Sequence, residues 1–253
     1  MAVLKRDFLP DDLLPLLASN GFDGSIAVQA CQTIEETQWL ISLAEKSEFI
    51  RGVVGWVDLR SADLTAELDA LANHPRLVGV RHVVQAEPDD EFMLRDDFRR
   101  GIAYLAGFGL TYDLLLYPRQ LPVAVKLVGE FPEQPFVLDH IAKPGIADGL
   151  MEPWTSGILE LAKHENVCCK LSGMVTEANW KHWKPDDFRP YLDVVFGAFG
   201  ADRLMIGSDW PVCTLSATYT ETIAIVDDYI RQFTRGEQEQ ILGGNCASFY
   251  GLQ

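Results

Sequence analysis

Polar and aromatic side chains follow seven short apolar runs of the chain, at the point where each run ends. They are Gln29 with Gln32, Trp56 with Asp58, Arg81 with His82, Asp113, Asp139 with His140, Lys170 with Ser172, and Asp209 with Trp210. A carboxylate can take a proton from water, and an imidazole can donate a hydrogen bond or bind a metal. A guanidinium can hold a carboxylate or a carbonyl oxygen. A purely structural protein would not need this set, which indicates a site for chemistry.

The apolar runs that must position these side chains are rich in β-branched residues and are each followed by a stretch with helical periodicity. They span residues 24–30, 50–59, 77–84, 109–116, 135–142, 167–173 and 204–211. This alternation is typical of parallel βα units. The sequence therefore predicts an α/β fold, a TIM-like (β/α)8 barrel, as a single domain over residues 1–253. In such barrels the functional residues gather at the carboxyl ends of the strands.

Seven runs are one fewer than the eight strands that close such a barrel. Residues 1–8 are too few and too charged for a barrel strand, so the usual first strand is expected to be lacking. Either it has been lost from this sequence, or another segment seals the gap. An open parallel sheet would leave unpaired edges on both flanks.

Period-two alternation along the strands predicts which side chains face the barrel mouth. Met205, Gly207 and Asp209 share one side of the last run, and the small Gly207 leaves room beside the carboxylate. The same alternation turns His140 toward the mouth and Asp139 toward the helical layer. His82 alternates away from Arg81 and is expected beneath a helix.

Helix signals appear between the runs. Residues 33–36, with the sequence TIEE, match a capping box, and a helix is expected to begin at Pro10. Leu64, Leu68 and Leu71 have the spacing of one helix face. Near the C-terminus, residues 237–252 indicate a final helix that is interrupted or capped around Gly243 and Gly244.

The composition of the chain limits the classes of molecule that it is expected to bind. The formal net charge is −16 with no run of Lys or Arg, which argues against nucleic acid and anionic membranes. No apolar stretch approaches the roughly 20 residues that span a bilayer. Cysteine spacing fits free thiols in a reducing cytoplasm, at Cys31, Cys168, Cys169, Cys213 and Cys246. The chain is therefore expected to be cytoplasmic and to act on a small molecule, with a homo-oligomer left open.

Five strings in order resemble the amidohydrolase-related family, most closely its L-fuconolactonase and L-rhamnonolactonase branch, a relative of 2-pyrone-4,6-dicarboxylate lactonase. They are GVRH (79–82), VLDHIAKP (137–144), KLSG (170–173), GSDWP (207–211) and the ending GNCASFYGL (244–252). Each string alone is weak, but together they cover nearly the whole chain. The resemblance implies a distorted TIM barrel that hydrolyses the lactone of a sugar acid or a related cyclic ester.

The family's usual first strand carries an HxH pair, and this sequence has no HxH. Two other functions of the same fold therefore stay open. One is a metal-dependent decarboxylase, and the other is a barrel that binds sugar acids with impaired catalysis.

Lactone hydrolysis requires a base for water, a donor or metal for the oxyanion, and an acid for the leaving alkoxide. Asp209 is the predicted base, although it could instead cap a loop or pair with a cation. His140 is predicted to donate to the lactone carbonyl or to bind a divalent metal such as zinc, although it could instead be a structural histidine bonded to the backbone. Zinc in a catalytic site takes three protein ligands, and His140 with Asp209 supplies two, so the metal site is incomplete and a metal-free site is equally open.

Six residues are predicted to contact the substrate: Arg81, Lys143, Asp113, Gln29, Trp56 and Trp210. Arg81 could alternatively form a salt bridge with Asp58 or Asp113, and the tryptophans could fill the core. Lys170 and Ser172 are expected to line the mouth or to form an inward polar layer. The polar, aromatic stretch at residues 176–187 is predicted to form a lid where substrate selectivity resides.

Overall fold

A computed structural model describes residues 2–71 and 74–252 and shows one parallel sheet in which the strands follow the order of the chain. Every predicted run contributes one strand. The strands are β1 (Ser25–Val28), β2 (Ile50–Gly55), β3 (Leu77–His82), β4 (Thr111–Leu114), β5 (Phe136–Leu138), β6 (Val167–Leu171) and β7 (Leu204–Ile206). The parallel α/β class that the sequence predicts is confirmed.

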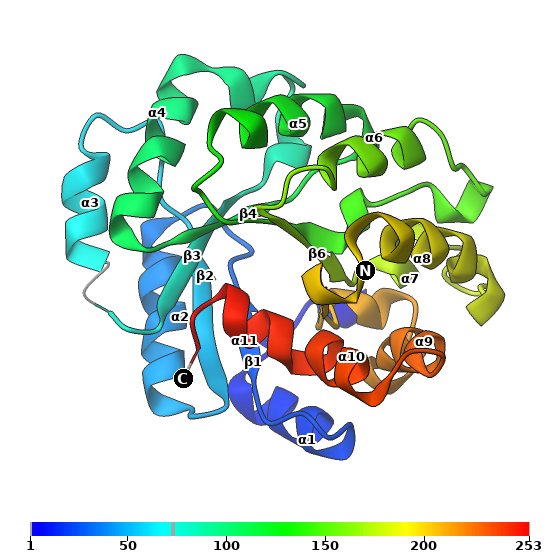
Figure 1. Cartoon of the computed structure of the whole chain (residues 1–253). Helices are drawn as coiled ribbons and strands as arrows, with labels where there is room; N and C mark the ends of the chain where they lie inside the picture. Colours follow the sequence, from blue (N-terminus) through cyan, green and yellow to red (C-terminus); the bar gives the residue numbers. More distant parts are fainter. Residues whose placement is uncertain (1, 72–73, 253) are drawn as a thin grey trace.

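Helices surround the outer face of the curled sheet (Figure 1). They are α1 (Pro10–Ser19), α2 (Ile34–Lys46), α3 (Leu64–Leu71), α4 (Asp96–Leu105), α5 (Leu121–Glu130), α6 (Trp154–Leu161), α7 (Met174–Glu177), α8 (Pro185–Phe199), α9 (Tyr219–Ile230), α10 (Arg235–Glu239) and α11 (Asn245–Phe249). Short 3-10 turns connect several of them. No helix in the described ranges is long and apolar enough to cross a membrane.

The local helix signals are largely confirmed. Helix α1 begins at Pro10, and the Thr33 hydroxyl accepts from the Glu36 amide at 3.1 Å at the start of α2. The Glu36 carboxylate accepts instead from the amides of Ala30 and Cys31, so only half of the predicted capping box forms. All five cysteines are free.

The sequence suggested a final helix that is interrupted or capped around Gly243 and Gly244. In the structure the C-terminal helix continues through both glycines. A π-helical turn over Gln240–Gly244 joins α10 to α11. A Cβ on Gly244 would lie 2.6 Å from the Gln240 side-chain oxygen, so the end of this flexible side chain packs directly against the glycine. The chain therefore remains helical up to Phe249.

Two apolar layers flank the sheet. The larger lies between the strands and the surrounding helices, and it includes Phe98, Leu114 and Leu138. A smaller layer fills the inside of the curl and consists of Val54, Val78, Val137, Met205 and Tyr250. Tyr250 follows α11, so the end of the chain contributes to the interior of the sheet.

The sheet has two ends in the described ranges, at β1 and β7. All four residues of β1 are partly exposed. The C-terminal segment from Gln240 to Phe249 packs against β7 (Figure 1). One edge is therefore covered by helix, which reduces the exposure of unpaired backbone groups.

The hydroxyl of Tyr250 donates to the Asp113 carboxylate, at 3.1 Å and 3.0 Å from its two oxygens, inside the sheet. We expect Tyr250→Phe to lower the free energy of unfolding by about 1.5–3 kcal/mol, because a buried carboxylate loses a hydrogen bond. Urea denaturation followed by circular dichroism measures this. Tyr104→Phe is the matched control, since Tyr104 is exposed; an equal loss in both variants would contradict the assignment.

Candidate active site

A left-handed turn follows β5 and carries two of the predicted site residues. Four consecutive non-glycine residues have positive φ: His140 at 53°, Ile141 at 46°, Ala142 at 59° and Lys143 at 49°. Each L-residue in this conformation costs about 1–2 kcal/mol. Such strain persists only where the surrounding structure holds it, and it is concentrated at functional sites.

Buried neighbours hold the left-handed turn in place. The Trp154 indole nitrogen donates to the Ile141 carbonyl oxygen at 2.6 Å, and Ile141 and Ala142 are fully buried. Gly173, with φ +65°, lies against the turn, and a Cβ there would come within 2.6 Å of the His140 Cβ. His140 therefore fits where it does because residue 173 has no side chain.

The strand parity predicted for this region was wrong for Asp139. Val137 belongs to the inner layer, and Asp139 continues that side into the interior, where it meets Arg81. His140 nevertheless lies near Asp209, because the left-handed turn redirects the chain after Leu138. Alternation applies only to extended backbone, so it could not place His140.

Asp209 and His140 face one another at the carboxyl ends of β7 and β5. The distance from His140 Nε2 to Asp209 Oδ1 is 3.6 Å, and the two side chains are 12% and 15% exposed. Asp209 also has a positive φ, of 54°. On the other side of the ring, His140 Nδ1 lies 2.8 Å from the Ser172 hydroxyl oxygen.

Burial lowers the pKa of His140, and the neighbouring Asp209 opposes this only in part. The imidazole is therefore neutral near pH 7. If the Ser172 hydroxyl donates to Nδ1, the ring proton is on Nε2, where it can donate toward the space beside Asp209. The pair combines a carboxylate that accepts protons with a neutral donor.

Below this pair lies a buried ion cluster formed by Arg81, Asp113, Asp139 and Lys170. Lys170 Nζ contacts Asp113 and is 2.8 Å from Asp139 Oδ1, while Arg81 Nη1 is 2.8 Å from Asp139 Oδ2. Burial alone would raise the pKa of Asp139, but Lys170 and Arg81 hold it below its usual value. Burial raises the pKa of Asp113 to about 6 against the opposing charge of Lys170.

Two residues predicted to contact the substrate are buried in or beside this ion cluster. Asp113 is completely buried between Lys170 and Tyr250. Gln29 is also completely buried, and its amide nitrogen donates to the Arg81 carbonyl oxygen at 3.0 Å. Arg81 in turn donates to the Gln29 carbonyl oxygen. Arg81 therefore forms a salt bridge, but with Asp139 in place of the anticipated Asp58 or Asp113.

Lys143 ends the left-handed turn and lies beside a residue that sequence reasoning did not single out. Lys143 Nζ is 3.9 Å from Glu177 Oε1, with the two side chains 16% and 23% exposed. Burial raises the pKa of Glu177, Lys143 opposes this, and Asp209 adds to it. Glu177 falls within the stretch predicted as a selectivity lid, which was the signal that could have identified it.

The predicted aromatic residues lie around the same end of the sheet. The Trp56 indole nitrogen donates to His82 Nδ1 at 3.3 Å. Trp210 packs edge-on against Phe8, with ring centroids 5.3 Å apart. His82 is buried and stacks on Phe92, next to Phe98 of α4, which confirms its expected place beneath a helix.

The donor set does not fit a complete zinc site. Three protein ligands are usual in catalytic zinc sites. Within the described part of the chain, no group of three or more His, Cys, Asp or Glu side chains is arranged to hold a metal. His140 and Asp209 therefore form a pair of possible donors without a third ligand in such a group.

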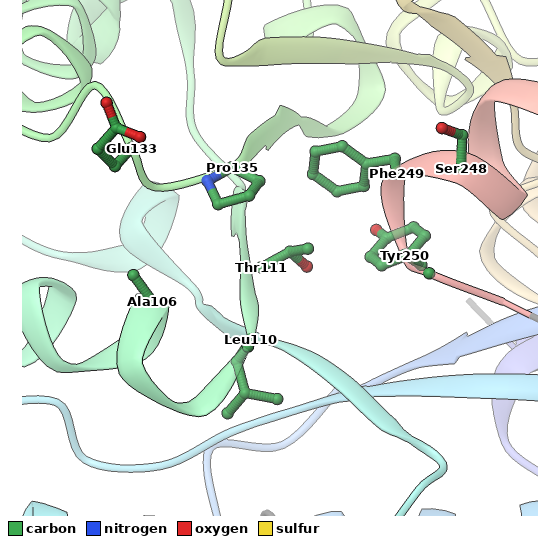
Figure 2. A pocket seen from close by; sticks show the side chains of 10 residues that line it. Ala106, Leu110, Thr111, Glu133, Pro135, Ser248, Phe249 and Tyr250 are labelled. Carbon is green, nitrogen blue, oxygen red and sulfur yellow. The ribbon is translucent and has the colours of Figure 1, made fainter.

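A pocket of about 320 Å³ lies at the opposite, amino end of the strands. Figure 2 shows Thr111 and Pro135 on one side of it and Phe249 and Tyr250 on the other. None of the predicted site residues lines this pocket, so the candidate active site is elsewhere, around Asp209 and His140.

Comparison with known proteins gives consistent matches over the whole chain. A family model described as amidohydrolase matches residues 2–252. An L-fucono-1,5-lactonase of Burkholderia multivorans is 40% identical, over 100% of this chain and 88% of its own length. The crystal structure of a Burkholderia multivorans amidohydrolase with bound zinc is 41% identical, with a TM-score of 0.96 over 100% of this chain and 92% of that one.

A more distant structure shows the fold alone. It is a probable 2-pyrone-4,6-dicarboxylic acid hydrolase of Acinetobacter baumannii, 18% identical, with a TM-score of 0.77 over 98% of this chain and 93% of that one. The family model and the L-fucono-1,5-lactonase confirm the resemblance identified from the five sequence strings.

The environment of His140 predicts a titration that can be measured. We expect its pKa to lie below the usual 6.5, and Asp209→Asn to lower it further, because the carboxylate is what favours the protonated ring. Imidazole ¹⁵N chemical shifts followed by NMR across pH 4–8 measure both values. A rise in the His140 pKa in Asp209→Asn would contradict the arrangement described here.

Proposed function

The chain belongs to the amidohydrolase family, and we propose that it is a lactonase that opens the ring of a sugar-acid lactone. The observation that carries this proposal is the pair at the carboxyl ends of β5 and β7. A carboxylate and a neutral imidazole face one another at 3.6 Å there, both largely shielded from solvent. The 40% identity to an L-fucono-1,5-lactonase supports the same reaction class.

The reaction needs a proton acceptor beside the attacking water, and Asp209 supplies it. Water attacks the lactone carbonyl carbon as Asp209 takes one of its protons, which gives a tetrahedral oxyanion. When the intermediate collapses, the bond to the ring oxygen breaks and the proton on Asp209 passes to that oxygen. The product is one open-chain hydroxy acid, whose carboxyl group ionises at neutral pH.

His140 stabilises the developing oxyanion. Its Nε2 proton points toward the space beside Asp209 when the Ser172 hydroxyl occupies Nδ1. A donor held in place before the reaction is worth about 2.7–4 kcal/mol of barrier in sites of this kind. Burial keeps the ring neutral, so His140 does not neutralise the Asp209 carboxylate by forming a permanent ion pair.

The other predicted site residues fall into two groups, according to whether their side chains are already bonded to other residues. Lys143, Trp56 and Trp210 are partly exposed, and we assign them to substrate contact. Arg81, Asp113 and Gln29 support the site from below, because they are occupied by one another, Asp139, Lys170 and Tyr250.

The comparisons favour a lactonase over the metal-dependent decarboxylase that the sequence left open. The relative that is 40% identical over the whole of this chain is an L-fucono-1,5-lactonase. The proposed steps use only side chains of this chain.

We further propose that the sheet is the seven-stranded part of an eight-position barrel. Its strands follow one another in chain order, as in (β/α)8 barrels, and β1 and β7 are the two ends of the series. The close similarity to the Burkholderia multivorans amidohydrolase supports this architecture. The position between β7 and β1 is where an eighth strand would pair.

Replacing the base tests the proposed function. With L-fucono-1,5-lactone as substrate, we expect Asp209→Asn to lower kcat by a factor of about 10²–10⁴, since an amide cannot take the proton from water. Acid release followed with a pH indicator measures the rate. Asp23→Asn is the matched control, because Asp23 is exposed and precedes β1 at the other end of the sheet.

Two outcomes would contradict this proposal. If Asp209→Asn keeps the parent rate, Asp209 is not the base. If the parent enzyme opens no aldonolactone in a panel of stereoisomers but aldonates raise its melting temperature, the chain is the binding protein that the sequence left open.

A further inference from the structure

The cationic side chains at the carboxyl end of the sheet differ in whether a ligand could pair with them. Arg81 and Lys170 are committed to Asp139 and Asp113 within the buried ion cluster. Lys143 lies outside that cluster and is partly exposed beside the catalytic pair. It is therefore the cation of this group that an anionic substrate could reach.

The carboxylate of Glu177 competes with a ligand for the Lys143 ammonium group. This carboxylate lies 3.9 Å from Lys143 Nζ and is close enough to Asp209 to interact with it electrostatically. Lys143 also lies over the Tyr117 ring, 5.8 Å from its centroid, which further defines where the ammonium group sits. With His140 neutral, Lys143, Glu177 and Asp209 together carry a formal charge of −1.

The position of Glu177 is maintained by contacts on both sides. Helix α7 begins just after Gly173, which packs against His140. Downstream, the Trp183 indole nitrogen donates to the Ser216 carbonyl oxygen, and the Ser216 hydroxyl donates to the Trp180 carbonyl oxygen, both at 3.3 Å. These bonds connect the segment of Glu177 to the loop that follows Asp209.

We propose that Glu177 is a specificity-determining residue that neutralises Lys143 and so selects uncharged polyhydroxylated lactones over lactones that carry a carboxylate. This inference rests on the proposed function. A carboxylate on the substrate would meet Asp209 and Glu177 without a free cation to offset them. Hydroxyl groups, in contrast, can accept from Lys143 and donate to Glu177 at the same time.

The same charges favour product release. Hydrolysis converts an uncharged ring ester and water into one open-chain hydroxy acid, whose carboxyl group loses its proton to solvent. The new carboxylate then lies beside Asp209 and Glu177, where like charges repel it. The site therefore binds the substrate better than the product, although both carry the same sugar hydroxyls.

A binding experiment separates this inference from the lactonase proposal. Isothermal titration calorimetry with L-fuconate and with the uncharged alditol L-fucitol gives two dissociation constants for each variant. We expect Glu177→Gln to bind L-fuconate about tenfold more tightly, because Lys143 becomes available to the carboxylate. The Kd for L-fucitol is expected to change by no more than about twofold, as the amide still makes hydrogen bonds.

Two controls complete the design. Glu133→Gln makes the same charge change at the amino end of β5, on an exposed residue, and is expected to leave both constants unchanged. The double variant Lys143→Gln, Glu177→Gln is expected to bind L-fuconate as weakly as the parent protein does. Circular dichroism confirms that each variant is folded.

The outcomes are decisive for each proposal separately. If Glu177→Gln does not tighten L-fuconate binding, or tightens L-fucitol equally, Glu177 does not select by charge, whether or not the enzyme opens lactones. If the selective tightening appears but the parent turns over no lactone, the charge selection stands and the catalytic proposal fails.

Discussion

The ion pairs of Asp139 are the interaction on which the carboxyl end of the sheet depends. Asp139 follows β5, and its two cations come from β3 and β6, so three strands are joined by one buried carboxylate. Removing either cation would leave a buried charge poorly compensated, which typically costs 3–5 kcal/mol. The left-handed turn begins at the next residue, so this anchor sets where His140 and Lys143 can lie.

The proposed catalytic pair, Asp209 and His140, and the ion cluster differ in how their charges are compensated. In the ion cluster, the buried carboxylates of Asp113 and Asp139 are paired with Lys170 and Arg81. Asp209 faces His140 instead, and burial lowers the pKa of this histidine, so the ring is neutral near pH 7. The Asp209 carboxylate is therefore not held in an ion pair with Arg81 or Lys170.

The end of the chain supports this arrangement from inside the curl. Tyr250 packs with Val54, Val137 and Met205, and its hydroxyl reaches Asp113, which contacts Lys170. The C-terminal segment is thus linked to the site through one hydrogen bond and one ion pair. The π-helical turn over Gln240–Gly244 precedes α11 in this segment.

The sequence by itself determined the seven strands, the parallel α/β class and the family, and it nominated Asp209 and His140 as candidate site residues, because local periodicity and short strings carry that information. Only the tertiary structure decided which charges pair, since Arg81 meets Asp139 and Lys170 meets Asp113 across strands far apart in the chain. It also decided how His140 reaches Asp209. Alternation assumes extended backbone, whereas a turn with positive φ is imposed by Trp154 and Gly173, which lie beyond the reach of any local pattern.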